Sequence, residues 1–305
     1  MPLHRLNKIT VAVPDVAATV PFYTDFGLEH LGEGRFATTD GAEQLELVAR
    51  DHRGLIEIGV GCDDPDDLDK LSSQLTAARL EHRREPEAVI ALDEASGVRV
   101  RIAIAPRYRQ EPTPQPVANS PGSDRRVNQR ADGAMRAAPV RPRRLGHVVV
   151  GSIDVARSEH LFVDVLGFKV SDAIRNVGKF VRCSTDHHNL MVAAAPARFL
   201  HHSSWQVDDV DEVGRAAAGM VAADPTRHVW GLGRHNVGGN FFWYLRDPAG
   251  NYAEYYSDLD IITEQLRWEP GEWGGRASQC AWAPPPPANF HLPDDVAELM
   301  MKGES

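Results

Sequence analysis

Residues 6–17 read Leu6-Asn-Lys-Ile-Thr-Val-Ala-Val-Pro-Asp-Val-Ala17, and residues 145–156 read Leu145-Gly-His-Val-Val-Val-Gly-Ser-Ile-Asp-Val-Ala156. Each segment starts with a β-branched run that is typical of a buried strand. Each then reaches an aspartate, a residue that readily caps the first turn of a helix. The same passage from strand to helix therefore occurs twice, which indicates an internally duplicated chain.

Later segments extend the duplication. Acidic runs that begin at Asp63 and Asp208 are typical of helix starts. The glycine-containing segments 92–97 and 245–250 are typical of hairpin turns. The order strand, helix and several strands occurs four times, with starts near residues 4, 54, 145 and 200. The sequence therefore predicts an α+β fold of four βαβββ modules in two domains.

The domain boundaries follow from the modules and from local composition. We expect an N-terminal domain at 1–106, a linker or crossover at 107–143, a C-terminal domain at 144–258 and a tail at 259–305. The linker is rich in proline and arginine and has few large apolar residues, as in surface segments. The tail is rich in tryptophan and proline, so we expect it to wrap around the body or a neighbouring subunit.

Composition narrows the class of protein. The chain has 305 residues, a net charge of −10 and no basic stripe, which argues against nucleic acid as a partner. It has no apolar run of membrane-spanning length and no apolar leader at its start. Its three cysteines lie far apart, so we expect neither disulfides nor a thiolate metal site. We therefore expect a cytoplasmic protein that does not bind membranes.

The histidines concentrate in the second half. Eight of the 13 lie between His147 and His235, including the doublet His201-His202. Because side chains alternate along a strand, His202 shares its face with two further polar residues, and such a face needs a cavity. Two imidazoles from this region and the carboxylate of Glu254 offer the ligand set of a two-His, one-carboxylate iron site.

A predicted hairpin brings the carboxylate to the same place. Across the turn that begins at Asp247, alternation puts Tyr244 and Glu254 on one wall. A carboxylate buried there is costly unless it is paired, and a bound metal would pair it. Aligning the two halves places Lys8, Leu55 and Arg101 opposite the candidate ligands. We therefore expect one metal site per chain, in the C-terminal half, and an N-terminal domain without metal ligands.

The motifs follow one another in a characteristic order. Gly233-Arg-His235 is followed after seven residues by Trp243-Tyr-Leu-Arg-Asp-Pro-Ala-Gly250 and then by Glu254. Upstream stand Leu145-Gly-His147, Asp186-His-His-Asn189 and Leu200-His-His202. Over roughly residues 4–258 the chain resembles the two-domain extradiol ring-cleavage dioxygenases of the vicinal oxygen chelate superfamily. It departs from their pattern at Trp243, where an aliphatic residue or Phe is usual.

The resemblance implies a cupped, barrel-like mixed sheet in each domain with helices outside. It also implies Fe(II), or Mn(II), held by His147, His202 and Glu254. The second histidine of the other doublet, His188, would be the catalytic acid–base. His235 and Tyr244 would hydrogen-bond the substrate oxygens and complete the catalytic set.

The implied reaction uses a small aromatic diol and dioxygen. The ring would open next to the diol and give a hydroxymuconic semialdehyde-type product. We expect Phe180, Trp205 and Phe242 on the wall of the substrate pocket, and a homo-oligomer that is a dimer, a tetramer or larger. His187 and His201, the other members of the doublets, would either donate hydrogen bonds to their neighbours or serve packing alone.

Three alternatives share the fold. A glyoxalase-like isomerase or a thiol transferase would place metal ligands in more than one module, and it has no need of the histidines and tyrosine named above. A non-enzymatic protein that traps small aromatics would not keep a complete ligand set. An Mn(II)-dependent dioxygenase would use the same ligands as the iron enzyme, because the two metals favour similar sites.

Overall fold

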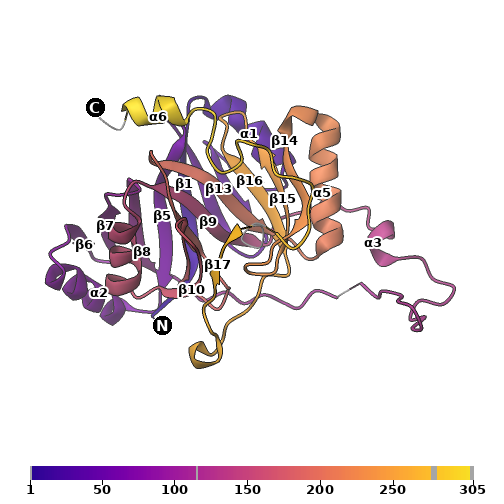
Figure 1. The fold of residues 1–305 in the computed structure, drawn as a ribbon, viewed down its shortest axis with the longest axis horizontal. Coiled ribbons are helices and arrows are strands. Elements are labelled where there is room, and N and C mark those ends of the chain that lie inside the picture. The colour runs from indigo at the N-terminus through magenta and orange to yellow at the C-terminus, as the bar shows by residue number, and fades with distance from the viewer. Residues whose placement is uncertain (1, 115, 276–279, 303–305) are drawn as a thin grey trace.

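The computed structural model describes residues 2–114, 116–275 and 280–302, which form two large sheets side by side (Figure 1). The N-terminal sheet has the strand order β2-β3-β4-β1-β5-β8-β7-β6. Its strands are β1 (Leu3–Val13), β2 (Glu29–Gly32), β3 (Arg35–Thr38), β4 (Ala42–Ala49), β5 (Gly54–Cys62), β6 (His82–Glu85), β7 (Ala88–Asp93) and β8 (Val98–Ile104).

The C-terminal sheet repeats this plan in the order β14-β15-β16-β13-β9-β12-β11-β10-β17. Its strands are β9 (Arg144–Ser152), β10 (Lys169–Ile174), β11 (Gly178–Arg182), β12 (Leu190–Ala194), β13 (Phe199–Gln206), β14 (His228–Arg234), β15 (Phe241–Arg246), β16 (Tyr252–Ser257) and β17 (Glu272–Trp273). In each sheet the first strands of the two modules pair antiparallel, and each module's last strand pairs parallel to its first. The predicted α+β fold of four modules is confirmed.

The module helices begin where the sequence predicted. They are α1 (Val16–Asp25), α2 (Pro65–Ala77), α4 (Val155–Glu159), which continues as the π-helix η1 (His160–Val165), and α5 (Val210–Ala223). The side chains of Asp15, Asp64, Asp154 and Asp209 each accept a backbone N–H three residues ahead. Because these bonds satisfy amides that have no partner inside a helix, each aspartate fixes the point where the chain leaves a strand and turns into a helix.

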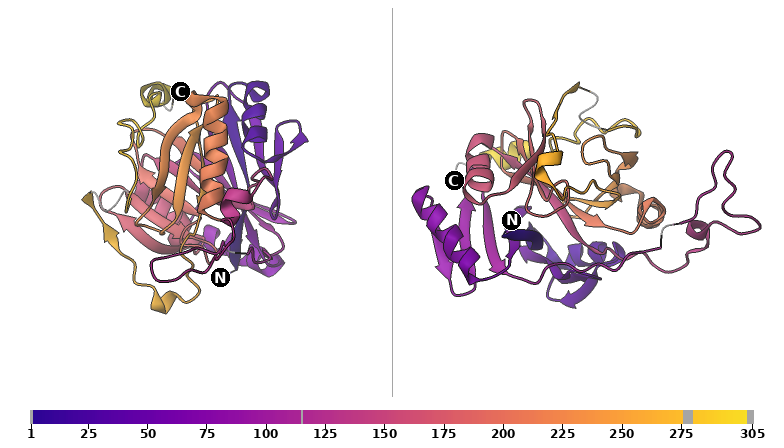
Figure 2. Two further views of the ribbon diagram at one scale, coloured as in Figure 1. Left: turned by 90° about the vertical axis from the view of Figure 1, so that its right-hand side faces the viewer. Right: turned by 90° about the horizontal axis from the view of Figure 1, so that it is seen from below.

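The two sheets pack along their central strands. Figure 2 shows them from two further sides. Strand β1 contacts β9, and β5 contacts β13. The ring of Phe26 stacks on that of Tyr255 with centroids 3.8 Å apart, and the Tyr255 hydroxyl donates to the Phe26 carbonyl. One continuous apolar core therefore joins both halves.

The linker and most of the tail lie outside the two sheets. The linker contains the short helix α3 (Asp132–Met135) and extends away from the sheets (Figure 1). The tail adds β17 to the edge of the C-terminal sheet and contains η3 (Gln265–Arg267) and α6 (Val296–Lys302); a further short helix, η2 (Pro225–Arg227), follows α5. Within the described residues, no helix has the length and apolar character to cross a membrane.

Candidate metal centre and substrate pocket

Three neighbouring strands bring the candidate ligands together. His147 lies on β9, His202 on β13 and Glu254 on β16, and these strands are adjacent in the sheet. The register pairs Ser204 with both His147 and Glu254. One ligand atom from each of the three side chains lies within 4.8 Å of the other two, and all three are buried. The predicted clustering of these residues is therefore observed.

The cluster has the charge and the donor atoms of a cation site. Glu254 is 0% exposed, and one of its oxygens lies 3.1 Å from His147 Nε2 and 3.4 Å from His202 Nε2. Its other oxygen accepts from Asn240 Nδ2 at 3.3 Å, while His202 Nε2 has no hydrogen-bond partner. Because an uncompensated buried carboxylate is costly, a divalent cation between the three side chains fits this arrangement.

The candidate acid–base residues line the same cavity. The ring of His188 packs 4.1 Å, centroid to centroid, from that of His147, and His235 Nε2 lies 3.0 Å from the Tyr244 hydroxyl. The loop that precedes His188 is held by Arg144, whose guanidinium donates to the two carboxylate oxygens of Asp186 at 2.7 and 2.9 Å. This buried bidentate pair gives the loop one geometry.

Burial sets the protonation states of these groups. It lowers the pKa of His188 and of His202 well below the usual value, with nearby imidazoles adding to the shift. Burial, aided by the charge of Glu254, raises the pKa of Tyr244 well above its usual value. At neutral pH both histidines are therefore neutral and able to accept a proton or a metal, whereas the Tyr244 hydroxyl keeps its proton and can donate a hydrogen bond.

A cavity of about 480 Å³ extends from this cluster. Its polar lining comprises the histidines, Asn240 and Tyr244, and none of the described residues that line it is Lys, Arg, Asp or Glu. Its apolar walls include Val149, Ile174, Phe180, Met191, Trp230 and Phe290. The volume suits a single small organic molecule with its polar end at the cluster and its apolar part against these walls.

Known proteins share the fold and the motifs. Residues 5–94 and 144–255 match the model of the Glyoxalase/Bleomycin resistance protein/Dioxygenase superfamily. The chain belongs to this superfamily. It is 30% identical over 306 residues to metapyrocatechase 2 of Cupriavidus necator, covering 94% of this chain and 91% of the relative.

Two further proteins are similar to part of the chain or to its fold. Over 44% of its length the chain is 31% identical to 45% of the manganese-dependent 2,3-dihydroxybiphenyl 1,2-dioxygenase of Geobacillus genomosp. 3. Homoprotocatechuate 2,3-dioxygenase from Arthrobacter globiformis has the same fold, with a TM-score of 0.74 at 16% identity over 95% of this chain and 91% of that one. Within the superfamily the chain is an extradiol catechol dioxygenase that uses a catalytic metal.

The wall residues expected from the sequence separate into two groups. Phe180 lines the cavity beside His188. Trp205 does not line it: this residue lies in the core with its Nε1 donating to Ser203, since it faces the opposite side of β13 from His202. Phe242 is fully buried behind the cavity and stacks on His235 at 4.0 Å. The structure therefore corrects the expectation for Trp205 and Phe242.

The structure adds partners that the sequence did not reveal. His187 Nδ1 bonds to His188 Nδ1 at 3.0 Å, and His187 Nε2 bonds to Asp172 at 2.8 Å. An ionised carboxylate only accepts, so His187 carries its proton on Nε2 and accepts from His188 through Nδ1. This leaves Nε2 as the basic nitrogen of His188. In the sequence only the doublet itself pointed to this chain of hydrogen bonds, because Asp172 lies in another part of the chain, on β10.

The N-terminal sheet has charged residues where the C-terminal sheet has ligands. Strand pairing aligns Lys8, Gly59 and Arg101 in the same way as it aligns His147, Ser204 and Glu254. The counterpart of His202 is therefore Glu57, two residues from the aligned Leu55, and the register irregularities fall at equivalent places in the two sheets. Within the described ranges, the C-terminal cluster is the single group of metal-ligand character.

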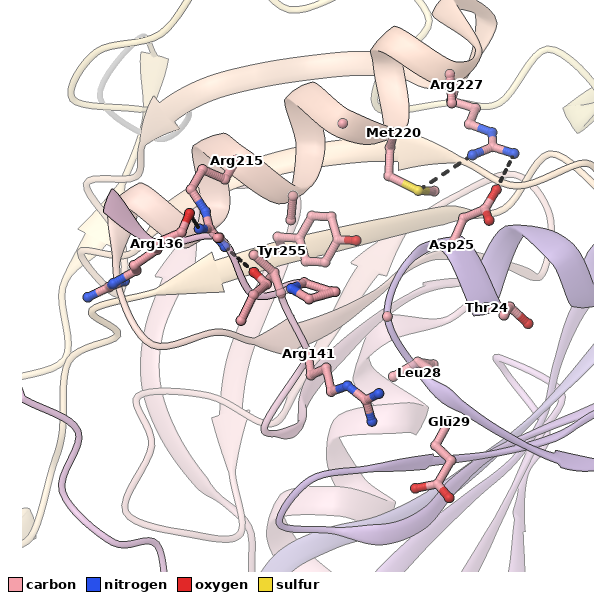
Figure 3. Close-up of a pocket in the computed structure, with 18 of the residues that line it drawn as sticks. Thr24, Asp25, Leu28, Glu29, Arg136, Arg141, Arg215, Met220, Arg227 and Tyr255 are labelled. Carbon is pink, nitrogen blue, oxygen red and sulfur yellow. Dashed lines mark hydrogen bonds and ion pairs between the residues drawn. The ribbon is translucent and has the colours of Figure 1, made fainter. Parts of the chain in front are cut away.

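A larger cleft of about 740 Å³ lies elsewhere, between the end of α1, the linker and α5. Figure 3 shows two of its arginines in structural contacts: Arg227 donates to Asp25 at 2.9 Å, and Arg215 donates to the Arg136 carbonyl. None of the candidate ligands or acid–base residues lines this cleft. We therefore assign the chemistry to the smaller cavity.

The buried imidazoles predict an acid-sensitive metal-free protein. Burial, opposed in part by a hydrogen bond to the Phe290 carbonyl, lowers the pKa of His201 to about 4. A histidine in an unfolded chain titrates near about 6.5, so between these values the unfolded state binds the extra proton and stability is lost as pH falls. We expect Tm to decrease from about pH 7 to about pH 5, and less steeply in His201→Gln. If calorimetry shows Tm decreasing equally steeply with pH in His201→Gln and in the unmodified protein, the assignment of this acid sensitivity to His201 is wrong.

Proposed function

We propose that this chain binds Fe(II) or Mn(II) through His147, His202 and Glu254 and opens the ring of a catechol with an uncharged, apolar substituent. The observation that carries the proposal is the convergence of three buried ligand atoms within 4.8 Å at one end of an apolar cavity. Both metals accept two imidazoles and a carboxylate, so the donor set fits either one. When bound, the metal supplies the site at which diol and dioxygen exchange electrons.

The side chains around the metal would handle protons and orientation. His188 is neutral and lies beside His147, so it can take a proton from a catechol hydroxyl and return it later to an oxygen of the opening ring. Tyr244 keeps its proton and, with His235, can hydrogen-bond a substrate oxygen. Both atoms of dioxygen enter the product, so the residues need supply no oxidant.

The walls define the substrate class. Among the described residues, no Lys or Arg lines the cavity to neutralise a carboxylate. Its lining away from the cluster is aliphatic and aromatic apart from His291, whose pKa is lowered by burial so that it is neutral at neutral pH. An uncompensated charge in such surroundings is costly. An alkyl or aryl substituent, in contrast, would bury apolar surface favourably.

A matched pair of substrates tests this proposal. 3-Propylcatechol and 3-(2-carboxyethyl)catechol are close in size and differ in charge. We expect kcat/KM for the carboxylated compound to be at least about 100-fold lower, because a buried unpaired charge costs more than about 3 kcal/mol. Oxygen uptake and the yellow ring-fission product measure both rates after anaerobic loading with Fe(II) or Mn(II).

A variant supplies the control. Met191 lies on β12 and lines the apolar wall. Met191→Lys is expected to reduce the preference for the uncharged compound, since the ammonium can pair with the carboxylate. Equal rates for both compounds in the unmodified protein would contradict the proposed substrate class, and no ring cleavage with either metal would contradict the proposed reaction.

A further inference from the structure

Arg53 joins the two halves of the molecule beside the metal site. It lies in the loop between β4 and β5 of the N-terminal sheet and is 7% exposed. Its Nε and Nη2 each donate to a carboxylate oxygen of Asp295 at 2.7 Å. Its Nη1 donates to the Leu200 carbonyl at 3.1 Å and to Asn251 Oδ1 at 3.2 Å. One guanidinium therefore binds three separate segments of the C-terminal half.

Two of these contacts lie just ahead of candidate ligands. Leu200 precedes the His201-His202 doublet on β13, and Asn251 immediately precedes β16, which carries Glu254. Asn251 is fully buried and also bonds to Asp247 in the hairpin turn. Because a planar guanidinium fixes the relative positions of its acceptors, Arg53 holds the starts of two ligand-bearing strands in one arrangement.

The third contact reaches His202 through the tail. Asp295 lies shortly after Phe290, whose carbonyl accepts from His201 Nε2 at 2.6 Å. With its proton on Nε2, a neutral His201 accepts through Nδ1 from His202 Nδ1 at 2.7 Å. His202 is then left with the lone pair of Nε2 directed to the side of Glu254, from which it lies 3.4 Å away. The tail carbonyl therefore selects the tautomer of His202 that can bind a metal.

The tail is held there by both charge and packing. Burial would raise the pKa of Asp295, but the hydrogen bonds and the charge of Arg53, with smaller contributions from a backbone hydrogen bond and Arg246, together lower it, so Asp295 is ionised at neutral pH. The Phe290 ring packs against Trp230 and Tyr244, with centroids 4.8 and 4.9 Å away. The carbonyl of Phe290 is thus fixed from two sides.

We propose that Arg53, a residue of the half without metal ligands, is a positioning residue for the metal centre and sets its affinity by holding His202 and Glu254 in register. The inference rests on the metal role proposed above. It gives the N-terminal sheet a function in the reaction, since the sheet supplies the anchor around which the ligand-bearing strands and the tail are assembled.

The test compares the affinity of purified full-length variants for Mn(II), measured from the electron paramagnetic resonance signal of the free ion. We expect Arg53→Met to bind Mn(II) about 10- to 100-fold more weakly, as for other residues that orient ligands. Arg53→Lys should recover only part of this loss, because one ammonium cannot form the fork of contacts. Asp295→Asn should lose less than Arg53→Met, because the contacts to Leu200 and Asn251 remain.

Arg84→Met is the matched control. Arg84 also binds an aspartate, Asp69, through Nε and Nη2 at 3.0 and 2.8 Å, but it lies far from the ligands on the N-terminal sheet. We expect its affinity for Mn(II) to equal that of the unmodified protein. A loss in Arg84→Met as large as in Arg53→Met would overturn the inference, because any weakening of the N-terminal sheet would then suffice.

The outcomes separate this inference from the proposed function. If the unmodified protein binds neither Mn(II) nor Fe(II), the proposed function fails, and this is known before any variant is compared. If it binds metal and Arg53→Met binds equally well, only the role of Arg53 fails. Should Arg53→Met not fold, Asp295→Asn decides, and an affinity within about twofold of the unmodified protein overturns the inference.

Discussion

Glu254→Gln is expected to abolish metal binding and ring cleavage together. The side chain is 0% exposed and is the single carboxylate of the cluster, so the amide leaves the two imidazoles without a negative charge to offset that of a bound cation. Since a catalytic metal contributes several kcal/mol to such a reaction, kcat/KM should decrease at least about 10³-fold. The metal-free variant should be no less stable than the unmodified protein, because the replaced carboxylate was buried without a full counter-charge.

Thermal unfolding with and without metal separates these effects. Ligand that binds only the folded state at 100 times its Kd stabilises by about 2.7 kcal/mol, so metal should raise Tm of the unmodified protein and leave that of Glu254→Gln unchanged. Glu57→Gln, at the position of the N-terminal sheet that corresponds to His202, is the control and should keep the metal-induced shift. A metal-dependent rise of Tm in Glu254→Gln would show that this carboxylate is not a ligand.

Local patterns in the sequence account for much of the fold. The aspartates that end β-branched runs cap their helices, and the repeat of that signal predicted four modules with starts close to those of β1, β5, β9 and β13. Alternation of side chains also predicts part of the cluster, because it is set by the backbone alone along a regular strand. It placed Tyr244 and Glu254 on one wall, and the structure pairs these residues across β15 and β16.

The sequence was less informative where strand register, or contacts between distant segments, determine which residues meet. Alignment of the two halves set Leu55 opposite His202, whereas the strand register makes Glu57 its counterpart, and only the pairing of the strands shows this. Phe290 and Asp172 reach the site from the tail and from β10, and no local pattern marks such contacts. The tail shows this clearly: its tryptophans suggested packing, but nothing in them indicated that a carbonyl there would orient a ligand.

His188→Phe is expected to lower kcat by about 10²- to 10⁴-fold, the usual contribution of a general acid–base group, with metal affinity retained. The structural reason is the chain of hydrogen bonds from Asp172 through His187 to His188 Nδ1. It leaves Nε2, on the side of the ring away from His187, as the basic nitrogen of His188. Phenylalanine keeps the ring that packs between Phe180 and His147, so the pocket wall survives while the proton acceptor is lost. Stopped-flow measurements of ring opening and a metal assay check the two parts of this expectation.

Asp172→Asn tests whether the tautomer matters as well as the ring. An amide can donate to His187 Nε2, which would move the proton of His187 to Nδ1 and turn it toward His188 as a donor. The basic nitrogen of His188 would then face His187, so kcat should decrease while KM and metal affinity stay close to those of the unmodified protein. Asp172→Glu should restore part of kcat because it accepts again. Equal kcat in Asp172→Asn and the unmodified protein would show that His188 acts without the hydrogen bonds from Asp172 and His187. An unchanged kcat in His188→Phe would show that His188 has no part in the reaction.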